Sequence, residues 1–213
     1  MASSDVEICN IALQLLGAEP IVALDEGTQR ASLCNQFYAT ARDTTLRDHQ
    51  WNFAQVRVLL TKESTAPAWG FDFQYQLPVE PYCLRVNEPF PMEAEWVVES
   101  DADGTGRKLL SDNDNIGIRY TARIVDPNLF TPMFVTALAH LLASMMALPL
   151  TEDFRQTQLM EAKYKALLSE ARSIDSQEGS PAQAGPHAEV LLNVRRHGAS
   201  ARWWSRSKNS FGF

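Results

Sequence analysis

The side chains that most often do chemistry are scattered along this sequence. Its histidines fall on different predicted elements and have no partner at helical spacing; they are His49, His140, His187 and His197. We expect His140, on an apolar helix, to be a hydrogen-bonded core histidine rather than a metal ligand. Ser144 lacks the Gly-x-Ser-x-Gly context of a hydrolase nucleophile. The sequence therefore predicts no catalytic residue, no metal site and no cofactor.

Two stretches imitate ligand-binding motifs, and turn chemistry explains them better. Residues 104–106 (Gly-Thr-Gly) lack the spacing of a phosphate loop and precede a strand pattern, so we expect a hairpin tip. The pairs Asp101/Asp103 and Asp112/Asp114 do not lead to the glutamate that completes a calcium loop. No two carboxylates are placed for acid–base catalysis.

One stretch does carry a binding signature, and it lies at the C-terminus. Residues 177–213 begin with a linker-like composition and then become basic, with interleaved aromatics. They hold five Lys or Arg against two Glu, a net charge of +3, so the rest of the chain's −7 is −10. We predict a docking arm anchored in pockets of a partner. Its anchors are Arg195, Arg196, Arg202, Trp203, Trp204, Arg206, Phe211 and Phe213. Contact with the parent domain, or stacking on single-stranded nucleic acid, is the alternative.

A strongly apolar central segment must organise the rest of the chain. Residues 128–151 contain no Asp, Glu, Lys or Arg, and their apolar residues recur at helical spacing around most of the circumference. A helix of this length could span a bilayer. Its polar strip of Thr136, His140 and Ser144, and the absence of flanking Lys or Arg clusters, favour a core helix and no membrane contact.

Shorter patterns on either side complete the predicted fold. A capping box at Ser4 and Glu7 begins a first helix, and a second runs from about residue 28 to 49. The charged residues of the second helix are interpreted as its solvated or subunit-facing side; they are Arg30, Arg42, Asp43, Arg47 and Asp48. A last helix is predicted from Thr151 to about residue 174. Alternating segments between residues 52 and 126 predict a small antiparallel sheet.

We therefore predict an α+β fold with three parts. Residues 1–51 and 127–176 form an antiparallel bundle of about four helices, residues 52–126 an inserted antiparallel β subdomain, and residues 177–213 an extended C-terminal arm. The cysteines are expected to be buried reduced thiols, as in a cytosolic protein; they are Cys9, Cys34 and Cys83. The N-terminus has no basic or apolar region typical of a signal peptide.

Two stretches within residues 6–172 resemble a known family. The first includes the Arg-Asp…His-x-Trp-Asn-Phe-Ala segment, which runs from Arg47 to Ala54. The second is framed by Asp126-Pro127 and by a Pro-Leu-Thr run that ends at Thr151. As a set they resemble the tail tubular protein A family of tailed bacteriophages, the head-to-tail adaptor (connector) proteins.

The resemblance implies a structural viral protein of the virion neck, not an enzyme, assembled in the host cytoplasm. Its copies would form a dodecameric ring with the portal protein above and the tail nozzle or tail-tube protein below. Genomic DNA would pass through the lumen without specific binding. The resemblance ends at about residue 172, so docking of the C-terminal arm on the portal is a separate hypothesis, drawn from the basic and aromatic residues of the arm. A virion-associated glycan hydrolase, or a small nucleic-acid-binding protein acting through its basic tail, is the alternative function.

Overall fold

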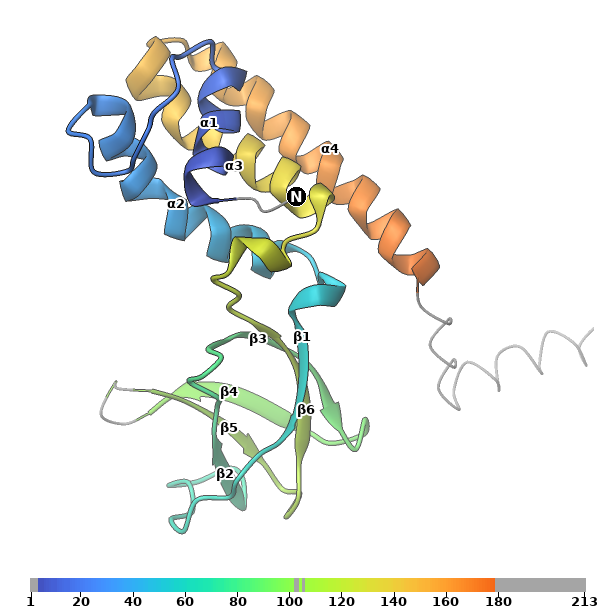
Figure 1. Ribbon diagram of the computed structural model, residues 1–213. Helices are drawn as coiled ribbons and strands as arrows, with labels where there is room; N and C mark the ends of the chain where they lie inside the picture. Colours follow the sequence, from blue (N-terminus) through green and yellow to red (C-terminus); the bar gives the residue numbers. More distant parts are fainter. Residues whose placement is uncertain (1–3, 102–103, 105, 179–213) are drawn as a thin grey trace, which may run out of the picture. The chain divides into compact units, whose positions relative to one another are not determined.

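The computed structural model describes residues 4–101, 104 and 106–178, which hold four α-helices and six β-strands (Figure 1). The helices are α1 (Asp5–Leu15), α2 (Gln29–Asp48), α3 (Pro132–Thr151) and α4 (Phe154–Glu178). The strands are β1 (Gln55–Leu59), β2 (Phe73–Gln76), β3 (Cys83–Phe90), β4 (Trp96–Ser100), β5 (Arg107–Ser111) and β6 (Gly117–Ala122). Residues up to Asp175 belong to one compact unit.

Helix α3 is the core of the helical part. It begins where Thr131 caps Phe134 N and Pro132 takes the first helical position, which needs no backbone donor. Within the described residues it is the one helix long and apolar enough to cross a membrane, yet 61% of its most apolar window is buried inside the protein. Helices α1, α2 and α4 contribute buried side chains to the same apolar cluster. The apolar circumference of α3 is therefore largely covered by protein.

Four aromatic rings fix the residues after α2 against the start of α3. Trp51 and Phe53 follow α2, and both rings lie edge-on to Phe134 with centroids 5.2 Å away. Phe130 packs on the same ring at 4.6 Å. The Trp51 indole nitrogen donates a hydrogen bond of 2.8 Å to Thr45 O, so its one polar atom is satisfied although the side chain is buried.

The strands form two antiparallel sheets, in the orders β1-β6-β3 and β2-β5-β4. In the first, β6 is central and pairs Ile118 with Val58 of β1. The inner faces of the two sheets share a second apolar cluster, which includes Tyr75 and Leu109 from one sheet and Ile118 and Tyr120 from the other. Alternation along β1 and β6 leaves the opposite face of the first sheet outside this cluster.

The α+β class is correct, but the predicted architecture of a four-helix antiparallel bundle with one inserted sheet is wrong. Helix α3 packs closely on α1 and α2, whereas α4 approaches no other described helix as closely. Between residues 154 and 174, helix α4 buries only a narrow stripe of Met160, Tyr164, Leu168 and Ala171. The β region forms two sheets because β5 pairs with β2 and β4, while β6 pairs with β1 and β3. Of the predicted arm, residues 177 and 178 belong to α4, and residues 179–213 lie outside the described residues.

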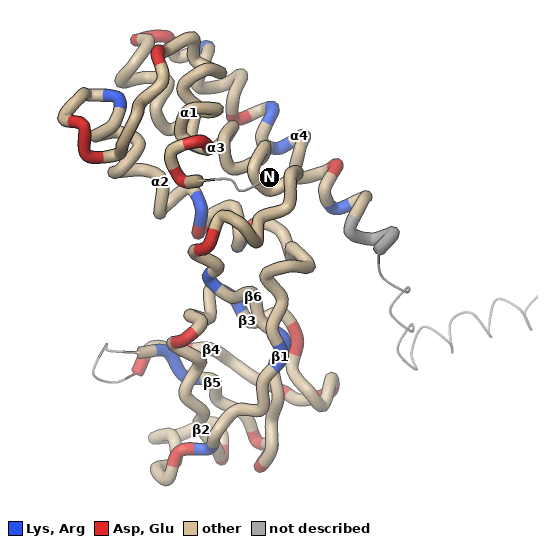
Figure 2. The backbone as a smooth tube through the Cα atoms, viewed as in Figure 1, with Lys and Arg blue, Asp and Glu red and all other residues tan. Residues whose placement is uncertain are grey.

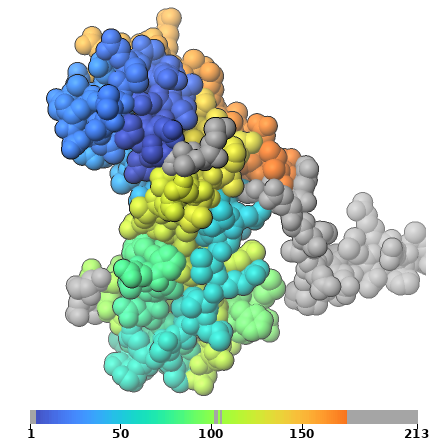
Figure 3. Space-filling view, in the orientation of Figure 1, coloured from blue at the N-terminus to red at the C-terminus, as the bar shows by residue number. Residues whose placement is uncertain are grey.

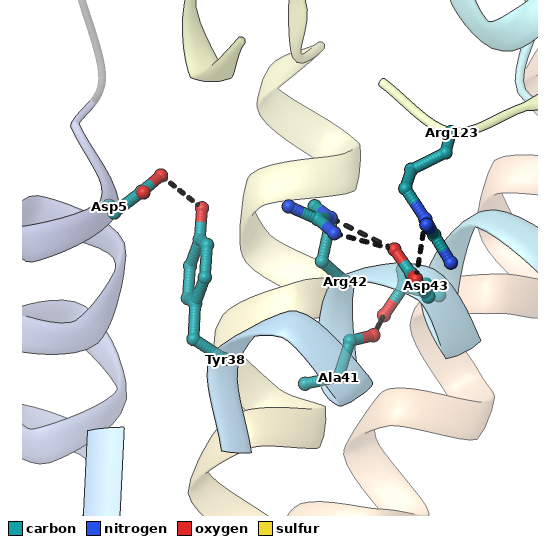
Figure 4. Close-up of polar contacts among 7 residues, drawn as sticks. Asp5, Tyr38, Ala41, Arg42, Asp43 and Arg123 are labelled. Atoms are coloured by element: carbon teal, nitrogen blue, oxygen red, sulfur yellow. Dashed lines mark hydrogen bonds and ion pairs between the residues drawn. The ribbon is translucent and has the colours of Figure 1, made fainter. Parts of the chain in front are cut away.

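Two predicted details of the helices also need correction. Pro149 lies inside α3, and Thr151, which was predicted to begin the last helix, ends α3 instead. The charged face of α2 is only partly solvated, because Arg42 is buried and holds Asp43 at 2.9 Å. Asp43 also forms an ion pair of 2.8 Å with Arg123, which follows β6 (Figure 4). This carboxylate thus ties α2 to the sheet.

The three cysteines are buried and free, in agreement with the prediction. Cys34 lies against the sulfur of Met146 at 3.6 Å, between α2 and α3. Burial raises the pKa of the Cys83 thiol to about 11, against the influence of nearby Arg107.

The raised pKa values of two buried tyrosines predict how the stability of the protein changes at alkaline pH. Burial, together with a hydrogen bond of 2.7 Å to Asp5, raises the pKa of Tyr38 (Figure 4). Burial and a hydrogen bond of 2.7 Å to Asp48 do the same for the pKa of Tyr164. Above pH about 10 the unfolded chain loses these protons while the folded protein keeps them, so the free energy of unfolding falls as pH rises.

We expect a slope of about 1.4 kcal/mol per pH unit for each tyrosine above pH about 10, measured by urea unfolding. The double variant Tyr38→Phe/Tyr164→Phe should show a flatter decline. Tyr82→Phe, a change of an exposed tyrosine, is the control. An equal decline in the double variant and the parent protein would show that other groups dominate.

Candidate functional site

The residues predicted from sequence as docking anchors, Arg195 to Phe213, all lie outside the described residues. Of the described histidines, His140 places Nδ1 2.8 Å from Thr136 O and is partly exposed, so it is less a core residue than expected. Within residues 4–101, 104 and 106–178, no three His, Cys, Asp or Glu side chains gather in a way that could hold a metal ion.

The described residues of the two motif-like stretches lie in turns, whereas Asp103 and Thr105 lie outside the described residues. Gly104 sits at the tip of the β4–β5 hairpin with φ +68°, and its N–H donates to Asp101 O at 2.8 Å. Asp112 accepts from the backbone N–H of Asp72 at 3.0 Å, and Asp114 pairs with Lys62. These carboxylates therefore serve the loops between strands, as predicted.

One cleft is lined by three carboxylates, Glu63, Glu99 and Asp101, and a glycan hydrolase would require two. It has a volume of about 490 Å³ and lies beside β5. Glu63 and Asp101 both approach its Lys108 nitrogen, at 2.9 and 3.0 Å. The hydrogen bonds that Lys108 donates, first to Glu63 and then to Asp101, raise the pKa of Lys108. A hydrolase needs a protonated acid across from a carboxylate, whereas these two groups act as counter-ions of one lysine.

A different feature has the character of a binding surface, and it lies on the β1-β6-β3 sheet. We call it the distal groove: residues 57–59, 88–90, 92 and 117–119, enclosing about 590 Å³. It sits where β1 and β3 end and β6 begins, while the other end of β6 leads to the Arg123–Asp43 pair. The groove is therefore at the end of the sheet remote from α2.

The floor of the groove consists of apolar side chains that are exposed to solvent. Leu59, Phe90 and Met92 are 67%, 70% and 72% exposed. Gly117 permits their approach, because a Cβ at this position would lie 3.1 Å from Leu59 Cδ2 and 3.7 Å from Phe90 Cβ. Covering all three side chains would contribute about 3–6 kcal/mol before the costs of association.

Three charged side chains lie next to one another across the sheet, beside the apolar floor of the groove. Arg57 of β1 lies opposite Arg119 of β6, which in turn lies opposite Glu88 of β3. Glu88 pairs with Arg119, and the Arg119 Nε atom is buried without a hydrogen-bond partner. Arg57 is exposed and has no ion-pair partner among the described residues. The groove therefore offers an apolar floor next to an unpaired positive charge.

The groove suits recognition by side chains rather than addition of a strand. β3 is an edge of its sheet, and two irregularities interrupt its pairing with β6, between Cys83 and Arg85 and between Val86 and Glu88. Pro89 further removes a backbone donor there. Bulges and proline make an edge a poor template for another strand.

Sequence reasoning missed this surface, although one signal was present. Val56, Val58 and Leu60 alternate along the first strand, and this alternation places Leu59 on the opposite face with Arg57. A large apolar residue on the polar face of a strand indicates a binding surface there. The contribution of Phe90 and Met92, about thirty residues away, had no local signal.

Comparison with known proteins does not identify the chain: no protein-family model and no curated protein matches it. The family resemblance described above therefore stays a prediction.

The exposure of the groove predicts that its floor contributes little to folding. Leu59→Ser and Phe90→Ser should each change the free energy of unfolding by no more than about 0.5 kcal/mol, because both side chains are already in water. Urea unfolding measures this. Leu109→Ser, at a fully buried position of the same β region, is the control and should cost several-fold more. A large loss at Leu59 would mean that the groove is closed in solution.

Proposed function

We propose that the protein is a structural head-to-tail adaptor of a tailed bacteriophage. Its copies form a ring between portal and tail and continue the DNA channel. The observation that carries this proposal is the distal groove, an apolar surface on a braced sheet. Its one carboxylate, Glu88, is engaged by Arg119, so the groove suits lasting contact with a folded protein better than proton transfer to a substrate. The resemblance over residues 6–172 points to the same function.

The charge distribution fits passage of DNA. Residues 1–176 carry a net charge of −10, and like charge suppresses adhesion of the phosphate backbone. DNA that slides through such a ring would not be held. The basic aromatic segment 177–213 would bind the portal, and its linker-like start would let it reach a neighbouring ring.

The proposal predicts a position in the virus particle. Gold-labelled antibodies against the purified protein should mark the neck of virions, between capsid and tail, because the adaptor ring is built only there. Electron microscopy measures the distribution of gold, and antibody pre-absorbed with the protein is the control. Label spread over the capsid, or none on intact or opened particles, would contradict the proposal.

The assignment of the arm has its own test. Helix α4 continues to Glu178, so a chain ending at that residue keeps the whole helix. This truncated protein should keep its far-ultraviolet circular dichroism but lose binding to purified portal, because the Arg, Trp and Phe anchors are removed. Co-sedimentation with portal rings measures binding.

Full-length controls separate the anchors from the loss of chain. Trp203→Ser/Trp204→Ser should weaken portal binding at least ten-fold. Trp69→Ser, which changes a tryptophan that is 85% exposed on the sheet part, should not. Undiminished portal binding by the truncated chain would refute the arm assignment. The proposal of a ring would then be tested by the neck labelling alone.

A further inference from the structure

The end of the helical part carries a surface whose chemistry is the reverse of the distal groove. We call it the acidic end surface: the α1–α2 loop with the start of α2 (residues 17–30) and the α3–α4 turn (residues 148–155). Gln29 Nε2 donates to Pro149 O at 3.4 Å, so the two segments are neighbours. Figure 3 shows the atoms of both at the same end of the helices.

This surface combines exposed apolar side chains with negative charge. Val22, Leu148 and Phe154 are 89%, 52% and 61% exposed. The two segments hold five carboxylates against two arginines, a net charge of −3, and all five are exposed. Figure 2 shows acidic residues at the top of the helices and in the loop at their left. They are Glu19, Asp25, Glu26, Glu152 and Asp153.

We propose that the distal groove of one copy receives the α3–α4 turn of a second copy of this chain. Phe154 enters between Leu59, Phe90 and Met92, and the Glu152 carboxylate faces Arg57. The inference deepens the proposed adaptor function and rests on it, because it names the partner of the groove within the ring.

Charge decides between this occupant and the chain's own C-terminal segment. The groove residues carry two arginines against one glutamate, a net charge of +1, and only Arg57 lacks a partner among the described residues. Residues 177–213 are also positive, at +3, so their approach would add like charge. The acidic end surface brings the opposite sign together with an aromatic anchor.

The backbone at the turn supports a role for Glu152. Its φ is +54°, and it is the one non-glycine residue with positive φ among those described. This left-handed position ends α3, where glycine or asparagine is the favoured residue. A glutamate here is a local cost to folding, and it holds an exposed carboxylate at the tip of the turn without an ion-pair partner in the described range.

The two surfaces lie too far apart to meet within one copy. The acidic end surface adjoins the N-terminus of α2, and the C-terminus of α2 adjoins the sheet, where Arg85 donates to Arg47 O. Helix α2 alone spans ~30 Å. The groove lies farther on, at the remote end of β1. The contact is therefore heterologous, the type that joins copies head to tail and closes rings.

Self-association of the full-length protein tests the contact. Sedimentation equilibrium from micromolar to near-millimolar concentration should show concentration-dependent association of the parent protein. Phe154→Asp and Phe90→Asp should each raise the dissociation constant at least ten-fold, because each places a carboxylate in the apolar floor. Trp69→Asp, which changes an exposed aromatic outside both surfaces, should leave it unchanged. Circular dichroism checks that every variant is folded.

A charge exchange gives a second readout that misfolding cannot imitate. Arg57→Glu and Glu152→Arg should each weaken association at low salt, by about three- to ten-fold. An equimolar mixture of the two single variants, and the double variant, should regain it, since the opposite charges meet again. The difference should shrink as salt rises.

Several outcomes would overturn the inference. These are a protein that is monomeric throughout, association equally sensitive to Trp69→Asp, and an Arg57–Glu152 exchange that does not restore binding. Association lost on Trp203→Ser/Trp204→Ser but kept in Phe154→Asp would assign the groove to the C-terminal segment instead. Neck labelling is independent: a labelled neck with insensitive association keeps the adaptor function and rejects this contact. Self-association that is weakened by the groove and turn variants, in a protein that does not label the neck, keeps this contact and rejects the adaptor function.

Discussion

The structure depends on the burial of α3, a helix without a single charged residue. Such a helix is stable in water only if other chain segments cover it, and α1, α2 and α4 supply that cover. The start of α3 also receives Trp51 and Phe53, which lead directly into β1. One apolar helix therefore fixes both the helical part and the point from which the sheets begin.

A second, polar interaction connects the sheets to the helical core. Asp43 of α2 binds Arg42 and Arg123, and the Arg123 guanidinium also lies over the Tyr82 ring at 4.4 Å. The contact with Arg123 is an ion pair without hydrogen-bond alignment. These charged groups fix the end of β6 that lies near α2. The distal groove lies at the opposite end of the same strand. The two apolar clusters thus stabilise the protein, and its uncovered ends are the surfaces that we propose for contact with other copies.

Local features of this fold could be read from the sequence, whereas pairings between remote segments could not. The Ser4–Glu7 capping box, the hairpin tip at Gly104 and the core helix follow from short-range chemistry. The division into two sheets was missed because alternation identifies a strand without naming its partner. Arg42 and Asp43 were predicted to be solvated or subunit-facing because no local pattern indicates Arg123, eighty residues from Asp43. The groove likewise combines Leu59 with residues of another strand and turn.

The seclusion of the sulfur atoms has a practical consequence for experiments on assembly. All three cysteines of the chain are fully shielded from solvent, and the Cys83 thiol is further held in its unreactive protonated form at neutral pH by its raised pKa. A maleimide dye or spin probe would therefore find no fast-reacting native thiol. One cysteine introduced on either exposed end gives a protein with a single labelling address, so distances between copies can be followed by fluorescence transfer without first removing the natural residues.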